Sequence, residues 1–196
     1  MIDAIKLGRI LAEEVVNEPG ICFYPATFKP PHKGHYAVAM ELISRNYITE
    51  LQILISDTVT EGITPEDAMT IWKMYVGSNP KIVLQIAKPM DTMMKYAYKH
   101  PDTGTIYVAV SDDETDDIHY LESLQKTFGD KIKAIAIHDK AENDTITAPH
   151  VRELLRLGDY EEFAKTIPEQ AYNKGYANKI FKMLAPKTTE PSDEQQ

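Results

Sequence analysis

The chain has 196 residues, a length that suits one domain with a substantial buried core. Its formal net charge is -9 and its basic residues form no strong cluster, so nucleic acid is not an expected partner. No apolar run approaches the ~18 residues that a membrane-crossing helix needs, and the first residues lack the features of a secretory signal. The single cysteine, Cys22, cannot form an internal disulfide, which fits a cytoplasmic location.

Short apolar runs alternate along the chain with stretches of helical periodicity. The first stretch, residues 3–17, is expected to form an amphipathic helix that ends at Pro19-Gly20. The expected strands are 21–25, 51–56, 82–86, 105–110 and 131–137. The further helices are expected at 34–45, 65 to near 77, 91–99, 118–128, 151–157, 159–166 and 168–184.

Strands that alternate with helices imply parallel pairing and right-handed crossovers. Because the five strands are short and apolar, both faces of the sheet should be covered. We therefore expect an α/β fold with a five-stranded parallel sheet and helices on both faces, formed by residues 1–186. Residues 187–196 have almost no apolar side chains and are expected to be a disordered tail. In such folds ligands bind beyond the carboxyl ends of the strands, so the loop after the first strand is the first place to search.

That loop carries two histidines three residues apart, in the segment ATFKPPHKGH at residues 26–35. At the start of a helix, His32 and His35 would point to the same side, where the helix dipole and free N–H groups favour an anion. Both imidazoles can donate hydrogen bonds to phosphate and carry charge near neutral pH. Gly34 would allow close approach to the backbone, and Thr27 adds a hydroxyl donor. A chance surface loop and a zinc site are the alternatives, although the other histidines and Cys22 make no recognisable ligand set with this pair.

A second candidate segment, DTITAPHVR at residues 144–152, follows the fifth strand. Thr147 can cap the helix that follows, and the guanidinium of Arg152 is suited to phosphate oxygens. The alternative is an ordinary helix start in which Arg152 forms a surface salt bridge.

Together the two segments resemble the signatures of the HIGH-superfamily nucleotidylyltransferases. In these, a Gly-Thr/Ser-Phe stretch leads into Pro-x-His-x-Gly-His, and Ile-Ser-x-Thr-x-x-Arg follows later in the chain. The matching positions are Thr27, Phe28, Pro30, His32, Gly34, His35, Ile146, Thr147 and Arg152. The chain departs from the pattern at Ala26, where Gly is usual, at Lys29, where Asp or Asn is common, and at Pro149, where Thr is usual. The similarity extends over residues 20–170, nearer to mononucleotide adenylyltransferases than to cytidylyltransferases.

The resemblance implies a Rossmann-like fold and an enzyme that transfers AMP from Mg-NTP to a small phosphorylated acceptor by direct in-line attack, with release of pyrophosphate. It assigns catalysis to His32 and His35. It assigns nucleotide binding to Thr27, Phe28, Gly34, Thr147 and Arg152. Lys29 departs from the family pattern, but as a lysine within the motif it is a further candidate for nucleotide binding. Asp112, after the fourth strand, is the candidate for acceptor binding. Mg²⁺ would arrive with the nucleotide, and no metal site formed by the protein itself is expected.

A cytidylyltransferase that uses CTP, or a non-catalytic module that keeps the fold, remain the alternative functions. The sequence predicts neither a membrane nor a nucleic acid as a partner. It leaves open the identity of the acceptor and whether the chain forms a homo-oligomer.

Overall fold

The computed structural model of the chain describes residues 18–111, 115–137 and 146–188, with only the backbone given for 115–120. The expected helix at 3–17 and the acceptor candidate Asp112 lie outside these ranges. The strands are β1 (Gly20–Ala26), β2 (Ile48–Ser56), β3 (Ile82–Ala87), β4 (Thr105–Ser111) and β5 (Ile132–Ile137). The helices are α2 (Lys33–Ser44), α3 (Pro65–Val76), α4 (Pro89–Lys99), α5 (Thr115–Phe128), α6 (Ala148–Leu157), α7 (Tyr160–Lys165), α8 (Glu169–Asn173) and α9 (Tyr176–Thr188), with a short 3-10 turn at Gly129–Lys131.

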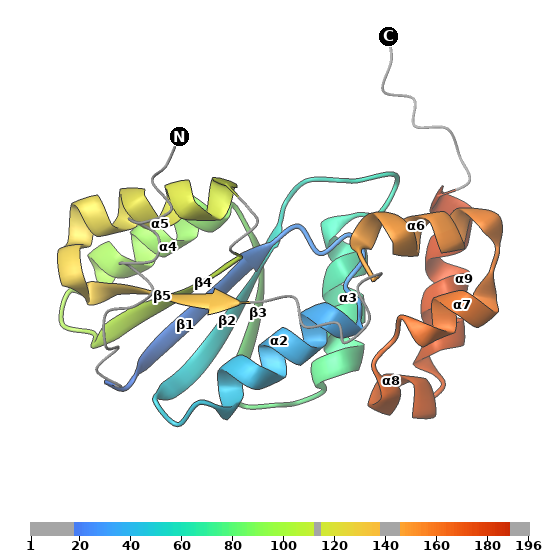
Figure 1. Cartoon of the computed structure of the whole chain (residues 1–196), viewed down its shortest axis with the longest axis horizontal. Helices are drawn as coiled ribbons and strands as arrows, with labels where there is room; N and C mark the ends of the chain where they lie inside the picture. The colour runs from blue at the N-terminus through green and yellow to red at the C-terminus, as the bar shows by residue number, and fades with distance from the viewer. Residues whose placement is uncertain (1–17, 112–114, 138–145, 189–196) are drawn as a thin grey trace, which may run out of the picture.

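All five strands are parallel and lie in the order β3-β2-β1-β4-β5, which confirms the expected sheet (Figure 1). From the central strand β1 the chain moves outward through β2 to β3, and then returns to the other side of β1 to form β4 and β5. The strand order therefore reverses between β1 and β4. This is the place where open parallel sheets bind their ligands.

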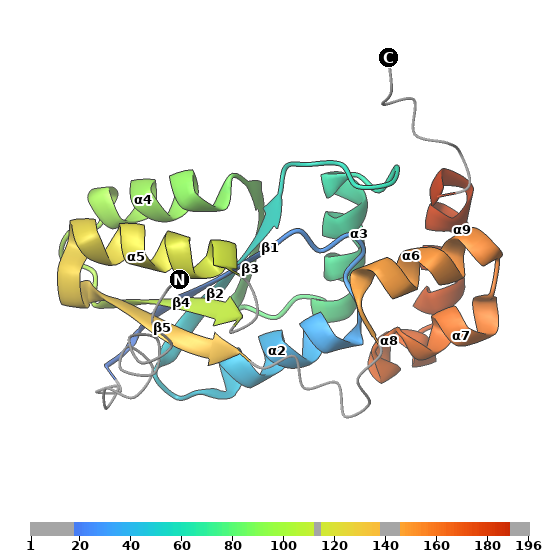
Figure 2. The same ribbon diagram turned by 45° about the horizontal axis from the view of Figure 1, so that its top comes forward.

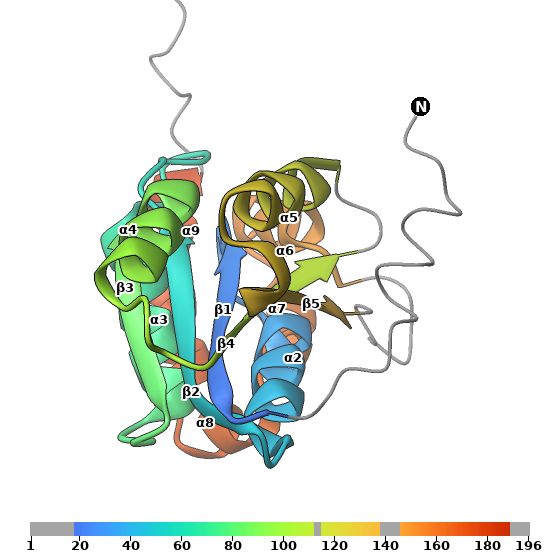
Figure 3. The same ribbon diagram turned by 90° about the vertical axis from the view of Figure 1, so that its left-hand side faces the viewer.

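Alternate residues of β1 enter two separate cores because successive side chains of a strand point to opposite faces. Cys22 and Tyr24 pack into the core that α2, α3 and the C-terminal helices cover, whereas Ile21 and Phe23 pack under α4 and α5. Figure 3 shows these helices on opposite faces of the sheet. The thiol of Cys22 is fully buried, as expected for a small apolar side chain, and burial raises its pKa to about 12. No helix in the described ranges is long and apolar enough to span a bilayer.

The helices α6 to α9 gather beyond one end of the sheet, next to α3 (Figures 1 and 2). The expectation of a single helix at 168–184 is wrong, because the structure has two helices in this segment, α8 and α9. Gly175 lies between them with a φ of 72°, a left-handed conformation that glycine adopts without strain and that ends a helix. This break allows α9 to fold back against α6, α7 and α8.

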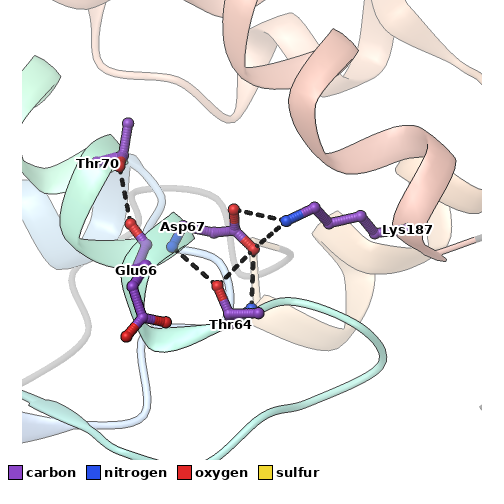
Figure 4. Close-up of polar contacts among 5 residues, drawn as sticks. All are labelled: Thr64, Glu66, Asp67, Thr70 and Lys187. Atoms are coloured by element: carbon purple, nitrogen blue, oxygen red, sulfur yellow. Dashed lines mark hydrogen bonds and ion pairs between the residues drawn. The ribbon is translucent and has the colours of Figure 1, made fainter.

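A polar cluster connects the start of α3 to the end of α9 (Figure 4). Thr64 caps α3 and accepts a hydrogen bond from the backbone N–H of Asp67, while the Asp67 carboxylate accepts one from the backbone N–H of Thr64. Lys187 donates to both oxygens of Asp67 at 2.8 and 2.7 Å. The sequence predicted that the tail begins at residue 187. This start is too early, since helix α9 continues to Thr188 and its Lys187 has a tertiary partner.

The environment of Asp67 favours its charged form. Burial acts to raise the pKa of this carboxyl, but the hydrogen bonds from Lys187 and Thr64 outweigh it and lower the pKa below its ordinary value. A carboxyl with a lowered pKa stabilises the fold above its unfolded-state pKa of about 3.9, and this contribution is lost as the pH falls through the folded-state pKa.

We predict that Asp67→Ala lowers the free energy of unfolding by about 1 kcal/mol at pH 7, through loss of the capping acceptor and of the Lys187 contact. The difference from the native chain should shrink as the pH falls below about 4. Thermal unfolding at several pH values measures both effects. Glu66→Ala is the matched control, because Glu66 is exposed in the same first turn. Equal effects of the two substitutions would contradict the assignment.

Candidate functional site

The two candidate segments meet at the carboxyl end of the central strand. The guanidinium Nη1 of Arg152, on α6, donates a hydrogen bond of 2.7 Å to the carbonyl oxygen of Lys29, in the loop after β1. These residues are 123 positions apart in the chain. Figure 2 shows α2 and α6 both beginning on this side of the sheet. The fold thus brings two helix starts, each expected to bind phosphate, to one place.

The backbone of the first loop makes a sharp turn at Phe28, whose φ of 55° lies in the left-handed region that residues other than glycine rarely occupy. Its ring is 1% exposed and packs edge-on against Tyr24, His35 and Trp72. The side chain of Phe28 therefore supports His35 from the core and is not presented to a ligand. Phe28 thus lies behind the site, although the resemblance assigned it to nucleotide binding.

Lys29 is also buried, with 1% of its surface exposed. Its amino group donates to the carbonyl oxygens of Thr27 and Ser56, each at 3.0 Å, and so joins the loops that follow β1 and β2. Burial lowers the pKa of this amino group, and the carboxylates of Glu66, Asp57 and Asp67 oppose that shift. Two of its three N–H donors are used within the protein. Lys29 therefore organises the loop, and at most one donor is left for a nucleotide.

His32 and His35 lie together at the start of α2, with their rings stacked at a centroid distance of 3.6 Å. The backbone N–H of His32 donates to Nδ1 of His35 at 3.2 Å. Because Nδ1 accepts, the proton of a neutral His35 ring is on Nε2, which can donate to a ligand. The buried Nδ1 of His32 has no hydrogen-bond partner among the described residues.

The surroundings of the histidine pair favour the neutral form of both rings. Burial lowers the pKa of His32 to about 4, and burial together with the neighbouring His32 holds the pKa of His35 well below its usual value. This corrects the expectation that the imidazoles carry charge near neutral pH. They can still act as neutral N–H donors, and the positive charge at the site comes from Arg152 and Lys29.

The first N–H of α2 already has a partner in the protein. The backbone N–H of Lys33 donates to the carbonyl oxygen of Thr166, between α7 and α8, at 2.8 Å. In the first turn of a helix the N–H groups have no acceptor within the helix, so the next donor in the turn is that of Gly34. Gly34 is buried, and it lies between the two histidines.

The second helix start differs from its expected position. Helix α6 begins at Ala148 and not at residue 151, because Thr147 is its N-cap and accepts a hydrogen bond from the backbone N–H of His150. Pro149 occupies the first turn, where its missing N–H costs nothing. The departure from the family pattern at Pro149 is therefore compatible with the helix start, and Thr147 itself is exposed.

Arg152 does form a salt bridge, as one alternative predicted, but not an ordinary surface pair. Its Nε lies 2.8 Å from Oε1 of Glu61, a residue of the loop after β2, and the Arg152 side chain is only 12% exposed. The guanidinium therefore connects three segments: α6, the loop after β1 and the loop after β2.

Sequence reasoning missed three groups that hold the site together. The hydroxyl of Tyr75, on α3, donates to the carbonyl oxygen of Pro31 at 3.1 Å. Tyr75 is buried. The helical periodicity of the sequence indicates on which side of a helix a residue lies, but it does not predict a contact of the tyrosine hydroxyl. Glu61 and the Thr166 carbonyl also act at the site, and both come from loops whose positions depend on tertiary packing.

The described residues contain no group of three or more His, Cys, Asp or Glu side chains that could hold a metal ion. They do form an open pocket of about 640 Å³ between the start of α2 and the helices α7 and α8. Its lining includes Lys33, Tyr160, Lys165, Ile167 and Tyr172. None of the predicted catalytic or nucleotide-binding residues lines it.

Comparison with known proteins identifies the fold. No family model and no curated protein sequence matches the chain. Among solved structures, the chain resembles the nicotinic acid mononucleotide adenylyltransferase of Plasmodium falciparum complexed with APC, with 16% identity and a TM-score of 0.59. The same enzyme complexed with NaAD gives 19% identity and a TM-score of 0.57. Both alignments cover 84% of this chain and 98% of the other. The chain therefore has the Rossmann-like fold of these adenylyltransferases.

Proposed function

We propose that the protein is a nucleotidylyltransferase that transfers AMP from Mg-ATP to a small phosphorylated acceptor and releases pyrophosphate. The observation that carries the proposal is the convergence of two helix starts at the switch point of the sheet, joined by the hydrogen bond between Arg152 and the Lys29 carbonyl. The adenylyltransferase fold supports it. The buried free Cys22 fits a reducing compartment, so the proposal includes a cytoplasmic location.

In the proposed reaction an oxygen of the acceptor phosphate attacks the α-phosphorus of the nucleotide. A new P–O bond forms while the bond between the α-phosphorus and the oxygen of the β-phosphate breaks, and pyrophosphate leaves with the electron pair. The acceptor phosphate is already ionised, so no strong general base is needed. Catalysis then consists of positioning and charge stabilisation. Mg²⁺ would enter with the triphosphate and neutralise charge on the leaving group.

His32 and His35 are assigned to the α-phosphate and the bridging oxygen. Their lowered pKa values suit neutral N–H donors, and His35 has its Nε2–H available because its Nδ1 is occupied. Such fixed donors require little rearrangement when charge develops in the transition state. The unpartnered buried Nδ1 of His32 is a further polar atom at this position.

The triphosphate is assigned to donors from both helix starts. Arg152 contributes its remaining guanidinium N–H groups, Thr147 and Thr27 contribute exposed hydroxyls, and Gly34 contributes its backbone N–H. Binding of the acceptor by Asp112, which follows β4, remains part of the proposal.

We predict that His35→Ala lowers the turnover rate by about 10²–10³, the usual cost of one preorganised donor. His35→Gln separates chemistry from folding, because Gln at this helix position can still accept the N–H of His32. It should melt near the native temperature and still be slow. The measurement is pyrophosphate release with each NTP and a panel of phosphorylated acceptors. His100→Ala, at the far end of α4, should leave the rate unchanged. A His35 variant with near-native rate would contradict the assigned role.

We predict that Arg152→Ala raises the dissociation constant for Mg-ATP about tenfold or more, since hydrogen bonds to charged groups are worth about 1.5–3 kcal/mol. Arg152→Lys should recover only part of the affinity, because lysine lacks the planar fork. Calorimetric titration measures both. Arg156→Ala is the control, since Arg156 is exposed one turn later and pairs with Glu153. Equal dissociation constants for Arg152→Ala and the native chain would mean that Arg152 serves structure alone.

We predict that Mg-ATP raises the melting temperature of the protein without any acceptor. At a free concentration of about 100 times the dissociation constant, binding to the native state contributes about 2.7 kcal/mol, which corresponds to several degrees. His32→Ala should give a smaller shift. A larger shift with Mg-CTP would favour the cytidylyltransferase alternative. If no NTP at millimolar concentration moved the melting temperature, a non-catalytic module would become the better account.

A further inference from the structure

Glu61 occupies a strained turn in the loop after β2. Its φ of 46° is left-handed, a conformation that is strained for a residue other than glycine. Thr60 and Ile63 close the turn with a pair of backbone hydrogen bonds of 3.1 and 3.0 Å. The left-handed backbone of Glu61 is therefore maintained by the residues on either side of it, and strain of this kind clusters at functional sites.

The C-terminal helix fixes where this turn lies. A β-carbon on Gly62 would lie 2.6 Å from the carbonyl oxygen of Lys187, so the turn packs directly on the backbone of α9. The Lys187 side chain donates to the Asp67 carboxylate, and this carboxylate accepts from the backbone N–H of Thr64, the residue directly after the turn (Figure 4). The position of Glu61 is thus set from both ends, by α3 and by α9.

This turn brings the Glu61 carboxylate to the Nε edge of Arg152, at 2.8 Å, while Nη1 of Arg152 reaches the Lys29 carbonyl. Glu61 is 55% exposed, whereas Arg152 is 12% exposed. The contact with Lys29 is a hydrogen bond, whereas the contact with Glu61 is an ion pair, because the Nε of Arg152 has no hydrogen-bond partner among the described residues. Nη2 makes no hydrogen bond to a described residue and Nη1 keeps one of its two N–H groups, so the guanidinium has donors left for a phosphate.

We propose that Glu61 is a positioning residue whose ion pair with the Nε of Arg152 fixes the guanidinium for the triphosphate. The proposal rests on the proposed function, in which Arg152 binds the nucleotide. A guanidinium that is already oriented loses less conformational entropy when the ligand binds, and its affinity is higher for that reason. The Glu61 charge itself opposes a phosphate, so its contribution to binding is the position in which the ion pair holds the guanidinium.

The test measures the dissociation constant of Mg-ATP for Glu61→Gln and for the native chain. Glutamine keeps the length of the side chain and the β-carbon on the strained backbone, but it loses the charge that pairs with Arg152. Removal of a negative charge near a triphosphate would by itself strengthen binding, whereas loss of the ion pair that positions the guanidinium should weaken it. We expect Glu61→Gln to bind at least threefold more weakly than the native chain. In an Arg152→Ala background the same substitution should not weaken binding further, since the group that Glu61 orients is gone.

Equal or tighter binding by Glu61→Gln with Arg152 present, or the same weakening in both backgrounds, would overturn the proposal. Melting temperatures without nucleotide show whether each variant is folded, and Glu153→Ala controls for loss of a carboxylate elsewhere near Arg152. If the native chain itself binds no nucleotide, the proposed function fails and this inference fails with it. That result differs from one in which the native chain and Glu61→Gln bind Mg-ATP equally well, which would overturn this inference alone.

Discussion

One guanidinium joins the parts of this protein that have to act together. Arg152 connects α6 to the loop after β1 through the Lys29 carbonyl, and to the loop after β2 through Glu61. Because its side chain is mostly buried, these contacts are less screened by solvent than those of a surface pair. Together with the hydrogen bond from Lys33 to the Thr166 carbonyl, this link holds the start of α2 next to the C-terminal helices. Any ligand that contacts both would meet donors that are already placed.

Burial shapes the chemistry of the histidine pair. A stacked pair of imidazoles under a loop cannot hold two positive charges, and the lowered pKa values of His32 and His35 express that cost. The lowered pKa values favour neutral rings, and the ring of His35 accepts a backbone hydrogen bond through Nδ1. Neutral donors fixed by the backbone are suited to charge that develops during a reaction, where a mobile cation would first have to be oriented.

The C-terminal helices contribute to the site without carrying its motifs. The Thr166 carbonyl caps the first N–H of α2, and the end of α9 supports the turn that presents Glu61. Lys187 adds an ion pair with Asp67 at the start of α3. The site is therefore assembled from segments at both ends of the described chain, and the helices beyond α6 are structural parts of it.

The sequence by itself determined the order of strands and helices, the parallel sheet and the two segments at which α2 and α6 begin. These features depend on local patterns: apolar runs, capping residues, and Gly and Pro at element ends. The convergence of the two segments followed from topology, because parallel strands end at one edge. Tertiary structure alone decided the roles of single side chains. Phe28 matches a position of the first motif and Lys29 lies next to it, yet both side chains are buried beneath the site. Nothing in the sequence pattern pointed to Glu61. The physical reason is that burial, pKa and hydrogen-bond partners depend on residues distant in the chain, such as the pairing of Arg152 with Lys29 across 123 positions.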